Sequence, residues 1–161
     1  MSKILGIGNA LIDIIVPVES EALLKKYAFA KGSQEHVDKE KFDAVCSELA
    51  LDDASQISGG SAANVLHSLA NLGHKTTFVG AIGDDAWGEM FEKDMQAAGV
   101  HFDPIRKQGD TGRVLHLVTP DQKKTVIGYT GVNDQLGEED LQDQYFSSYT
   151  HLVLDGYLTP K

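Results

Sequence analysis

The chain has 161 residues, of which 42% are hydrophobic and 24% charged, and its formal net charge is −10. These values are typical of one globular domain, and the acidic balance argues against nucleic acid or an acidic membrane surface as a partner, because both require clustered Lys and Arg. No apolar run approaches the ~20 residues of a membrane span. The single cysteine, Cys46, precludes a disulfide within the chain, so a cytoplasmic protein is the simplest expectation.

The N-terminal segment predicts strands. Residues 3–18 are rich in Ile and Val and are interrupted at Gly6 and Gly8, which indicates two β-segments joined at the glycines. A short helix is expected at residues 21–27. A turn and a short polar strand are expected at residues 30–37.

Three amphipathic helices and a buried strand follow. The first helix lies within residues 38–51, and its apolar side chains at helical spacing are Phe42, Val45, Cys46 and Leu49. The second ends at Gly73, and its apolar face consists of Ala62, Val65, Leu66, Leu69 and Ala70. Residues 75–83 form the strand. The third helix has Asp84 or Asp85 as its N-cap, Trp87, Met90, Phe91 and Ala98 facing inward, and Gly99 as its stop.

The order strand, helix, strand, helix is typical of βαβ units around a mainly parallel sheet. Residues 112–131 instead predict a β-hairpin around a Pro-Asp turn, and residues 100–107 another strand of this kind, beside the parallel sheet and not inside it. A short helix is expected at residues 138–149 and a final buried strand at 151–158. No covering helix follows that strand, so we expect a truncated α/β protein.

The first glycine cluster, "GIGNAL", is a poor dinucleotide site. Leu11 stands where the third glycine of G-x-G-x-x-G belongs, and the residues after it are strand-like. A dinucleotide-dependent oxidoreductase therefore requires that Gly6 and Gly8 open a helix. P-loop, zinc-ligand and G-x-S-x-G patterns are absent from the sequence.

The second cluster, "SGGSAAN", opens a helix. Gly59 and Gly60 let a ligand approach the backbone, and a helix N-terminus binds phosphate readily. However, the nearest cations in the sequence are Lys41 and Lys75, and the amide of Asn64 suits a neutral polyol better than a dianion. Glycines that serve only close packing of helix and strand are the alternative.

Two polar residues near the first glycines are further candidates. Asp13 lies within "LIDIIV", where an isolated carboxylate would cost several kcal/mol. It either caps a nearby turn or accepts hydrogen bonds from ligand hydroxyls, and its position favours neither. Asn9 could serve the same ligand or form an Asx-turn.

These residues resemble the PfkB, or ribokinase-like, family of carbohydrate and nucleoside kinases along essentially the whole chain. The most specific part is residues 59–83, which match the family's first signature at Gly59, Gly60, Ala62, Asn64, Gly73 and Gly83. Leu66 departs from it, since the signature expects Ser, Thr or Ala there. "GNALIDI" together with "SGGSAAN" is most similar to the adenosine-kinase-like branch.

The resemblance implies a ribokinase-like α/β fold, in which a mainly parallel, Rossmann-like sheet is flanked by helices and carries a small β-sheet lid. Residues 1–161 would be its N-terminal part, with lid strands within residues 12–18, 31–37 and 100–130. It also allows a homodimer formed through the lid.

The implied activity is ATP-dependent phosphorylation of a sugar or nucleoside hydroxyl, with Mg²⁺. The resemblance assigns acceptor contacts to Asp13, Gly59, Gly60 and Asn64, places Asn9 beside them, and adds Asn133 from "GVNDQL". Lid residues such as Gln34 would discriminate among acceptors.

The family's second signature, which supplies the catalytic base and the anion hole, is not present in these 161 residues. We therefore expect no catalytic residue or metal ligand in this chain, ATP and Mg²⁺ to bind mainly elsewhere, and the isolated chain to be inactive. A sugar kinase for ribose or a hexose and a non-catalytic sugar- or nucleoside-binding module stay open as alternatives.

Overall fold

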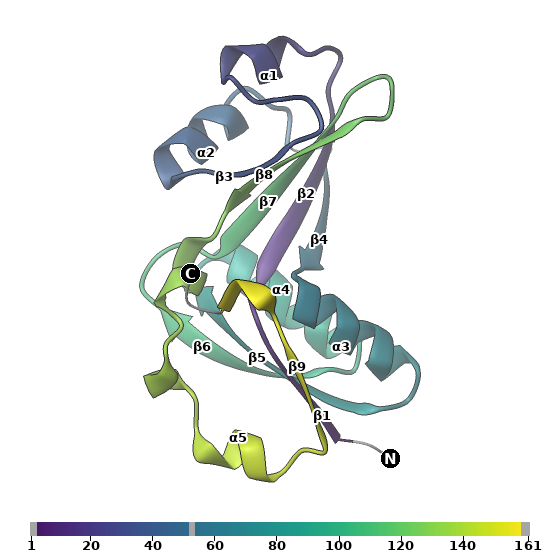
Figure 1. Cartoon of the computed structure of the whole chain (residues 1–161), viewed down its shortest axis with the longest axis vertical. Helices are drawn as coiled ribbons and strands as arrows, with labels where there is room; N and C mark the ends of the chain where they lie inside the picture. The colour runs from purple at the N-terminus through teal and green to yellow at the C-terminus, as the bar shows by residue number, and fades with distance from the viewer. Residues whose placement is uncertain (1–2, 52–53, 159–161) are drawn as a thin grey trace.

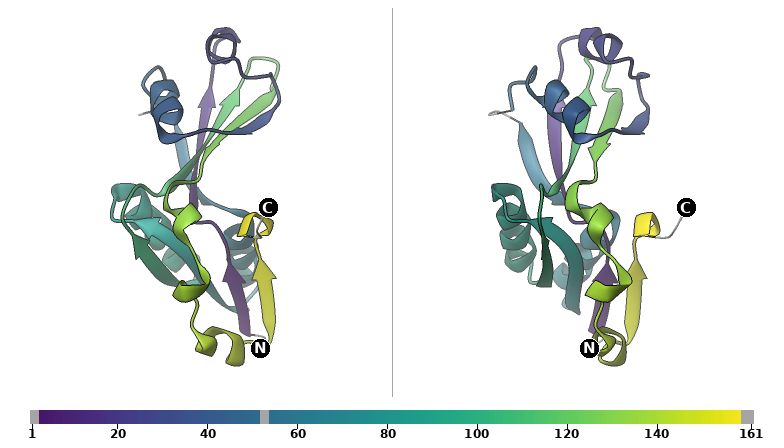
Figure 2. Two further views of the ribbon diagram at one scale, coloured as in Figure 1. Left: turned by 60° about the vertical axis from the view of Figure 1, so that its left-hand side comes forward. Right: turned by 90° about the vertical axis from the view of Figure 1, so that its left-hand side faces the viewer.

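The computed structural model describes residues 3–51 and 54–158 and consists of two lobes, each built on its own sheet (Figure 1). The lower lobe holds both ends of the described chain, and the upper lobe stands above it on the extended strands (Figure 2). In the described part of the chain, no helix is long and apolar enough to cross a membrane.

The lower lobe contains a four-stranded parallel sheet. Its order is β6 (His101–Lys107), β5 (Lys75–Gly83), β1 (Lys3–Ile7) and β9 (His151–Leu154). Two helices cover one face, α3 (Ser61–Asn71) and α4 (Ala86–Ala97). The other face is covered by α5 (Asp143–Ser147) and by the 3₁₀ helices η1 (Gly131–Gln135) and η2 (Glu138–Asp140), with a further 3₁₀ turn, η3 (Gly156–Leu158), after β9.

Alternation along the central strand β1 divides the core of this lobe. Ile4 points to the helices α3 and α4, whereas Leu5 and Ile7 point to the opposite face. Gly6 has no side chain because Leu66 of α3 occupies that space, with its Cγ 2.8 Å from where a Cβ would lie. The prediction that Leu66 faces the core is confirmed, since its exposed fraction is 0%.

The upper lobe contains a five-stranded mixed sheet. Its order is β3 (Gln34–His36), β8 (Lys124–Tyr129), β7 (Gly112–Val118), β2 (Leu11–Pro17) and β4 (Ser55–Gly59). β7 and β8 form the predicted hairpin, β2 pairs in parallel with β7, and β4 pairs antiparallel with β2. The helices α1 (Ala22–Lys26) and α2 (Lys39–Cys46) pack on one face of this sheet. The other face is turned towards the lower lobe.

Arg113 of β7 contacts aromatic rings of both lobes. The guanidinium of Arg113 lies 5.0 Å from the ring centroid of Phe42 in α2 and 5.9 Å from that of Trp87 in α4. It lies 5.7 Å from the ring of Tyr129 as well. Such contacts with aromatic faces are attractive, so Arg113 holds the upper sheet against the lower lobe.

The predicted helix ends are confirmed. Asp85 is the N-cap of α4, and its carboxylate accepts a hydrogen bond from the backbone N–H of Gly88 at 2.8 Å. Gly73 and Gly99 follow α3 and α4 with φ of +86° and +80°, a conformation that glycine adopts without strain.

Three expectations about strands and faces are wrong, and one strand was not predicted. The strand at 100–107 is not beside the parallel sheet but inside it, because β6 pairs in parallel with β5. As an edge strand it tolerates Pro104, whose missing N–H needs no partner. Hydrophobic periodicity did not predict the strand β4, because Ile57 is its single large apolar residue.

The final strand β9 is an edge strand and not a buried one, with Leu152 and Leu154 exposed by 46% and 61%. Val65 is also 43% exposed, since the contact of α3 with the sheet centres on Ala62 and Leu66.

Candidate functional site

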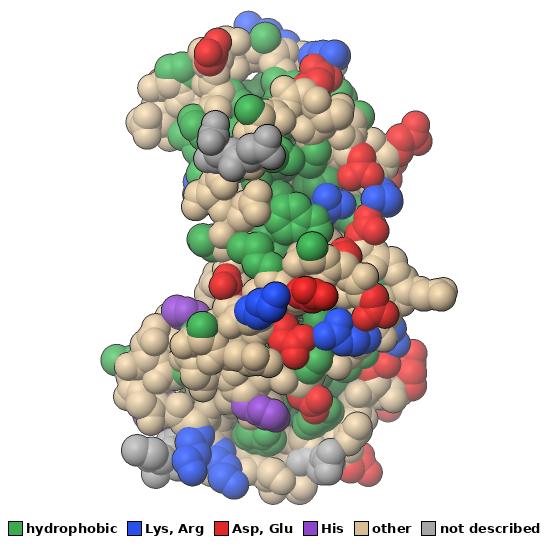
Figure 3. All heavy atoms as spheres, turned by 180° about the vertical axis from the view of Figure 1, so that it is seen from behind, with side chains coloured by type: hydrophobic (Ala, Val, Ile, Leu, Met, Phe, Trp, Pro, Cys, Tyr) green, Lys and Arg blue, Asp and Glu red, His purple; other side chains and the backbone are tan. Residues whose placement is uncertain are grey.

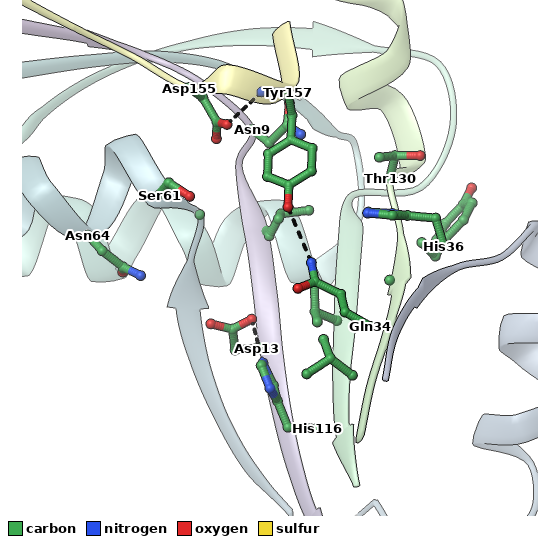
Figure 4. Close-up of a pocket in the computed structure, with 16 residues that line it drawn as sticks. Asn9, Asp13, Gln34, His36, Ser61, Asn64, His116, Thr130, Asp155 and Tyr157 are labelled. Carbon is green, nitrogen blue, oxygen red and sulfur yellow. Dashed lines mark hydrogen bonds and ion pairs between the residues drawn. The ribbon is translucent and has the colours of Figure 1, made fainter. Parts of the chain in front are cut away.

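A cavity of about 310 Å³ lies between the two lobes (Figure 4). The upper sheet contributes one wall through β2, β3, β7 and β8, and the start of α3 contributes a second. The residues that follow β1 and β9, at the carboxyl ends of two parallel strands, complete it. Ligands of open α/β sheets bind at such strand ends, so the cavity is the candidate functional site.

Asp13 reaches the cavity through the alternation of β2. Ile12 and Ile14 are fully buried against the helices of the upper lobe, so the side chain between them points to the opposite face. The carboxylate is 22% exposed, and its Oδ1 lies 3.0 Å from Nε2 of His116. Asp13 is therefore a partnered carboxylate at an opening, which suits hydrogen bonds to ligand hydroxyls.

Gly59 and Gly60 are required by the packing around the cavity. A Cβ on Gly59 would lie 2.4 Å from Oδ2 of Asp13, and one on Gly60 would lie 2.2 Å from the backbone oxygen of Asn9. Gly60 also has φ of +104°, which L-residues rarely adopt. Both glycines thus let other parts of the site come close, and Gly60 itself lines the cavity.

The N-terminus of α3 faces the same cavity. No side chain caps this helix, and the first intrahelical bond runs from the N–H of Asn64 to the oxygen of Gly60 at 2.9 Å. Ser61 and Asn64 line the cavity, so free backbone N–H groups, a hydroxyl and an amide meet there.

Of the two other asparagines predicted for the site, Asn9 lines the cavity and Asn133 does not. Asn9 is 6% exposed and makes no side-chain hydrogen bond within the described chain. The amide of Asn133 exchanges two 2.9 Å hydrogen bonds with the backbone of Ala10 and donates a third, of 2.8 Å, to the oxygen of Thr130. These three hydrogen bonds hold the chain between β1 and β2, and the contact of Asn133 with the acceptor stays a prediction.

Sequence reasoning missed much of the lining. His36, His116, Asp155 and Tyr157 are among the residues that it did not name. The ring centroid of Tyr157 lies 5.9 Å from that of His36, and the Tyr157 hydroxyl accepts a 3.3 Å hydrogen bond from the side-chain amide of Gln34. The backbone N–H of Tyr157 donates a 3.0 Å hydrogen bond to the carboxylate of the buried Asp155. The alternation of "VLHLV" could have placed His116 on the face of Asp13. No local signal marks Asp155 or Tyr157.

The cavity is acidic. Asp13 and Asp155 line it, and no Lys or Arg does so among the residues described. Over the back of the molecule acidic and basic side chains are mixed (Figure 3). Within residues 3–51 and 54–158, no three His, Cys, Asp or Glu side chains converge as a metal site. Cys46 is half-buried outside the cavity, and burial raises the pKa of its thiol, as befits a structural cysteine.

The glycines of the first cluster open no helix. Gly6 lies within β1, and Gly8 is followed directly by β2. A dinucleotide site of the Rossmann type needs a helix N-terminus at that point. The reading as a dinucleotide-dependent oxidoreductase is therefore wrong.

Comparison with known proteins identifies the family. The model of the pfkB family carbohydrate kinases matches residues 34–161, so the chain belongs to this family. An ATP-dependent ribose-1-phosphate kinase of Halopiger xanaduensis is 33% identical over 109 residues, which are 66% of this chain and 37% of that protein.

Two solved structures share the fold. A probable sugar kinase of Rhizobium etli superposes with a TM-score of 0.86 and 30% identity, over 98% of this chain and 47% of that one. The adenosine kinase of Sinorhizobium meliloti gives 0.83 and 31%, over 98% and 48%. The predicted ribokinase-like fold is confirmed, and the chain spans about half the length of these structures. The family is one of carbohydrate and nucleoside kinases, which use ATP and a divalent metal.

Proposed function

We propose that the protein transfers a phosphoryl group from ATP to a hydroxyl of a sugar or nucleoside, and that this chain supplies the acceptor pocket. The observation that carries the proposal is the pairing of Asp13 with His116 at 3.0 Å, opposite the uncapped start of α3. A carboxylate that is already oriented accepts hydrogen bonds from vicinal hydroxyls, and the amides of Asn9 and Asn64 can donate and accept.

A neutral acceptor fits better than a phosphorylated one. The described lining has two carboxylates and no Lys or Arg, so a sugar phosphate would meet repulsion and no compensating cation. We therefore do not propose ribose 1-phosphate, the substrate in the name of the Halopiger protein, as the acceptor of this chain.

Within neutral acceptors, we favour a nucleoside. The lining of the cavity combines polar side chains, including Asp13 and Asn64, with apolar surface from Val114, Val126 and the ring of Tyr157. A ribose suits the first and a planar base the second, because aromatic and aliphatic surfaces pack well on a base. Ribose or a hexose is the second candidate.

ATP and Mg²⁺ have no assigned contacts in this chain. Among the described residues, no Lys or Arg of the kind that usually accompanies a phosphate lines the cavity, and no metal ligands converge. Here the residues bind and orient the acceptor, and we propose that the donor and the metal bind through the rest of a longer kinase. The isolated chain should then bind a nucleoside without phosphorylating it, and measurable transfer would contradict this.

Isothermal titration calorimetry of the 161-residue chain with adenosine, ribose and ribose 1-phosphate tests the proposal. We expect adenosine to bind best and ribose 1-phosphate worst, and Asp13→Ala to weaken adenosine binding by about tenfold or more. Asp84→Ala is the matched control, since that carboxylate is 78% exposed and pairs with Arg106 outside the cavity. If Asp13→Ala binds adenosine like the wild type, the acceptor assignment fails. A complete protein that binds adenosine but transfers no phosphate would favour the non-catalytic module.

A further inference from the structure

His116 and Asp13 meet on the cavity face of two neighbouring strands. β2 and β7 run parallel with Asp13 opposite Val114 and Ile15 opposite His116, so the two polar residues are diagonal neighbours. Their side chains are 22% and 16% exposed, and Figure 4 shows the imidazole reaching up to the carboxylate.

The chemistry of the pair defines where the imidazole proton lies. An ionised carboxylate only accepts hydrogen bonds, so the 3.0 Å contact requires a hydrogen on Nε2 of His116. Nδ1 is buried and has no partner within the described chain. A hydrogen there would be an unsatisfied donor, whereas a bare lone pair costs less, which favours the Nε2–H tautomer.

His116 consequently has no polar atom left for a ligand. One ring nitrogen is committed to Asp13 and the other is enclosed, so any effect of His116 on polar recognition must pass through the carboxylate. That carboxylate is confined from the other side too, because its Oδ2 lies 2.4 Å from where a Cβ on Gly59 would stand. Rotation about the last bond of Asp13 is thus restricted by a donor on one side and by the backbone on the other.

We propose that His116 is a positioning residue for acceptor binding. Its Nε2–H occupies Oδ1 of Asp13, which leaves Oδ2, beside Gly59, to accept the hydrogen bond of the acceptor hydroxyl. This inference rests on the proposed function of the cavity. Its physical basis is preorganisation, because a carboxylate that is already oriented loses less conformational freedom when the ligand binds.

A double-mutant cycle with adenosine calorimetry tests the proposal. We expect His116→Leu to weaken adenosine binding about tenfold, and His116→Gln, whose amide retains a donor, to recover most of the loss. In an Asp13→Ala background, His116→Leu should cause no further loss. His101→Leu is the control, because that exposed histidine lies on β6, away from the cavity. An equal loss with and without Asp13, or no loss, would overturn the positioning role.

A second measurement separates this inference from the proposed function. Long-range ¹H–¹⁵N spectra of the ligand-free wild type at about pH 8 report the histidine tautomers directly. We expect His116 as the Nε2–H tautomer, and a mixture of tautomers in Asp13→Ala. If no sugar or nucleoside binds but the tautomer is as expected, the proposed function fails and the His116–Asp13 link stands. An Nδ1–H tautomer in the wild type would refute the link itself.

Discussion

Gly60→Ala should be among the most damaging single-methyl additions in this protein. The residue has φ of +104°, a conformation that costs an L-residue about 1–3 kcal/mol. The new Cβ would also lie 2.2 Å from the backbone oxygen of Asn9. No side-chain rotation relieves such a contact, so either the start of α3 or the end of β1 must shift, at a further cost of about 1–3 kcal/mol.

The expected loss is therefore about 2–6 kcal/mol of a total unfolding free energy of about 5–15 kcal/mol. Gly73→Ala is the matched control. Gly73 has φ of +86°, but nothing lies within 4 Å of its would-be Cβ, so the variant isolates the backbone strain at about 1–2 kcal/mol. Urea denaturation followed by circular dichroism measures both losses. Equal losses for the two variants would refute the close approach of Gly60 to Asn9.

Two further predictions concern titratable groups of the lower lobe. Burial and the hydrogen bond to Asp103 raise the pKa of Tyr145 to about 12, so its contribution to stability is complete below pH 10 and is lost as the pH rises through 12. Ultraviolet titration should show a phenol that ionises near pH 12 and that Tyr145→Phe removes; a titration curve that Tyr145→Phe leaves unchanged in that range would contradict this. Burial acts to raise the pKa of Asp85, but hydrogen bonds from the hydroxyl and N–H of Thr111 and the N–H of Gly88 lower it overall. Its contribution is thus present above about pH 4 and lost below. Asp85→Ala should cost about 1–2 kcal/mol in urea denaturation at pH 7 and less at pH 3, and an unchanged stability at pH 7 would contradict the capping role.

The elements that sequence alone predicted are those whose signals are local. The helices α3 and α4 follow from apolar spacing and from Asp85, Gly73 and Gly99 at their ends. The hairpin of β7 and β8 follows from two apolar runs around Pro-Asp. Spacing and capping act within one or two turns of the chain, so they can be seen without knowing any partner.

Of the candidate site, the sequence determined that Asp13, Gly60 and Asn64 belong to motifs with ligand chemistry, and all three line the cavity. It could not show which asparagine also has a structural role, and only the tertiary structure reveals the hydrogen bonds of Asn133 with Ala10 and Thr130. The same amide chemistry serves either purpose, and the difference lies in which atoms surround it.

Tertiary structure alone decided which strands pair and which distant residues meet. β6 joined the parallel sheet although its sequence resembles the hairpin strands, because pairing depends on the neighbour that a strand finds and not on its own pattern. His116 meets Asp13 from 103 residues away, and Tyr157 meets Gln34 from 123 residues away. The sequence by itself therefore determined most of the elements, the family and the polar motif, whereas the cavity and its oriented carboxylate exist only once the two sheets have packed together.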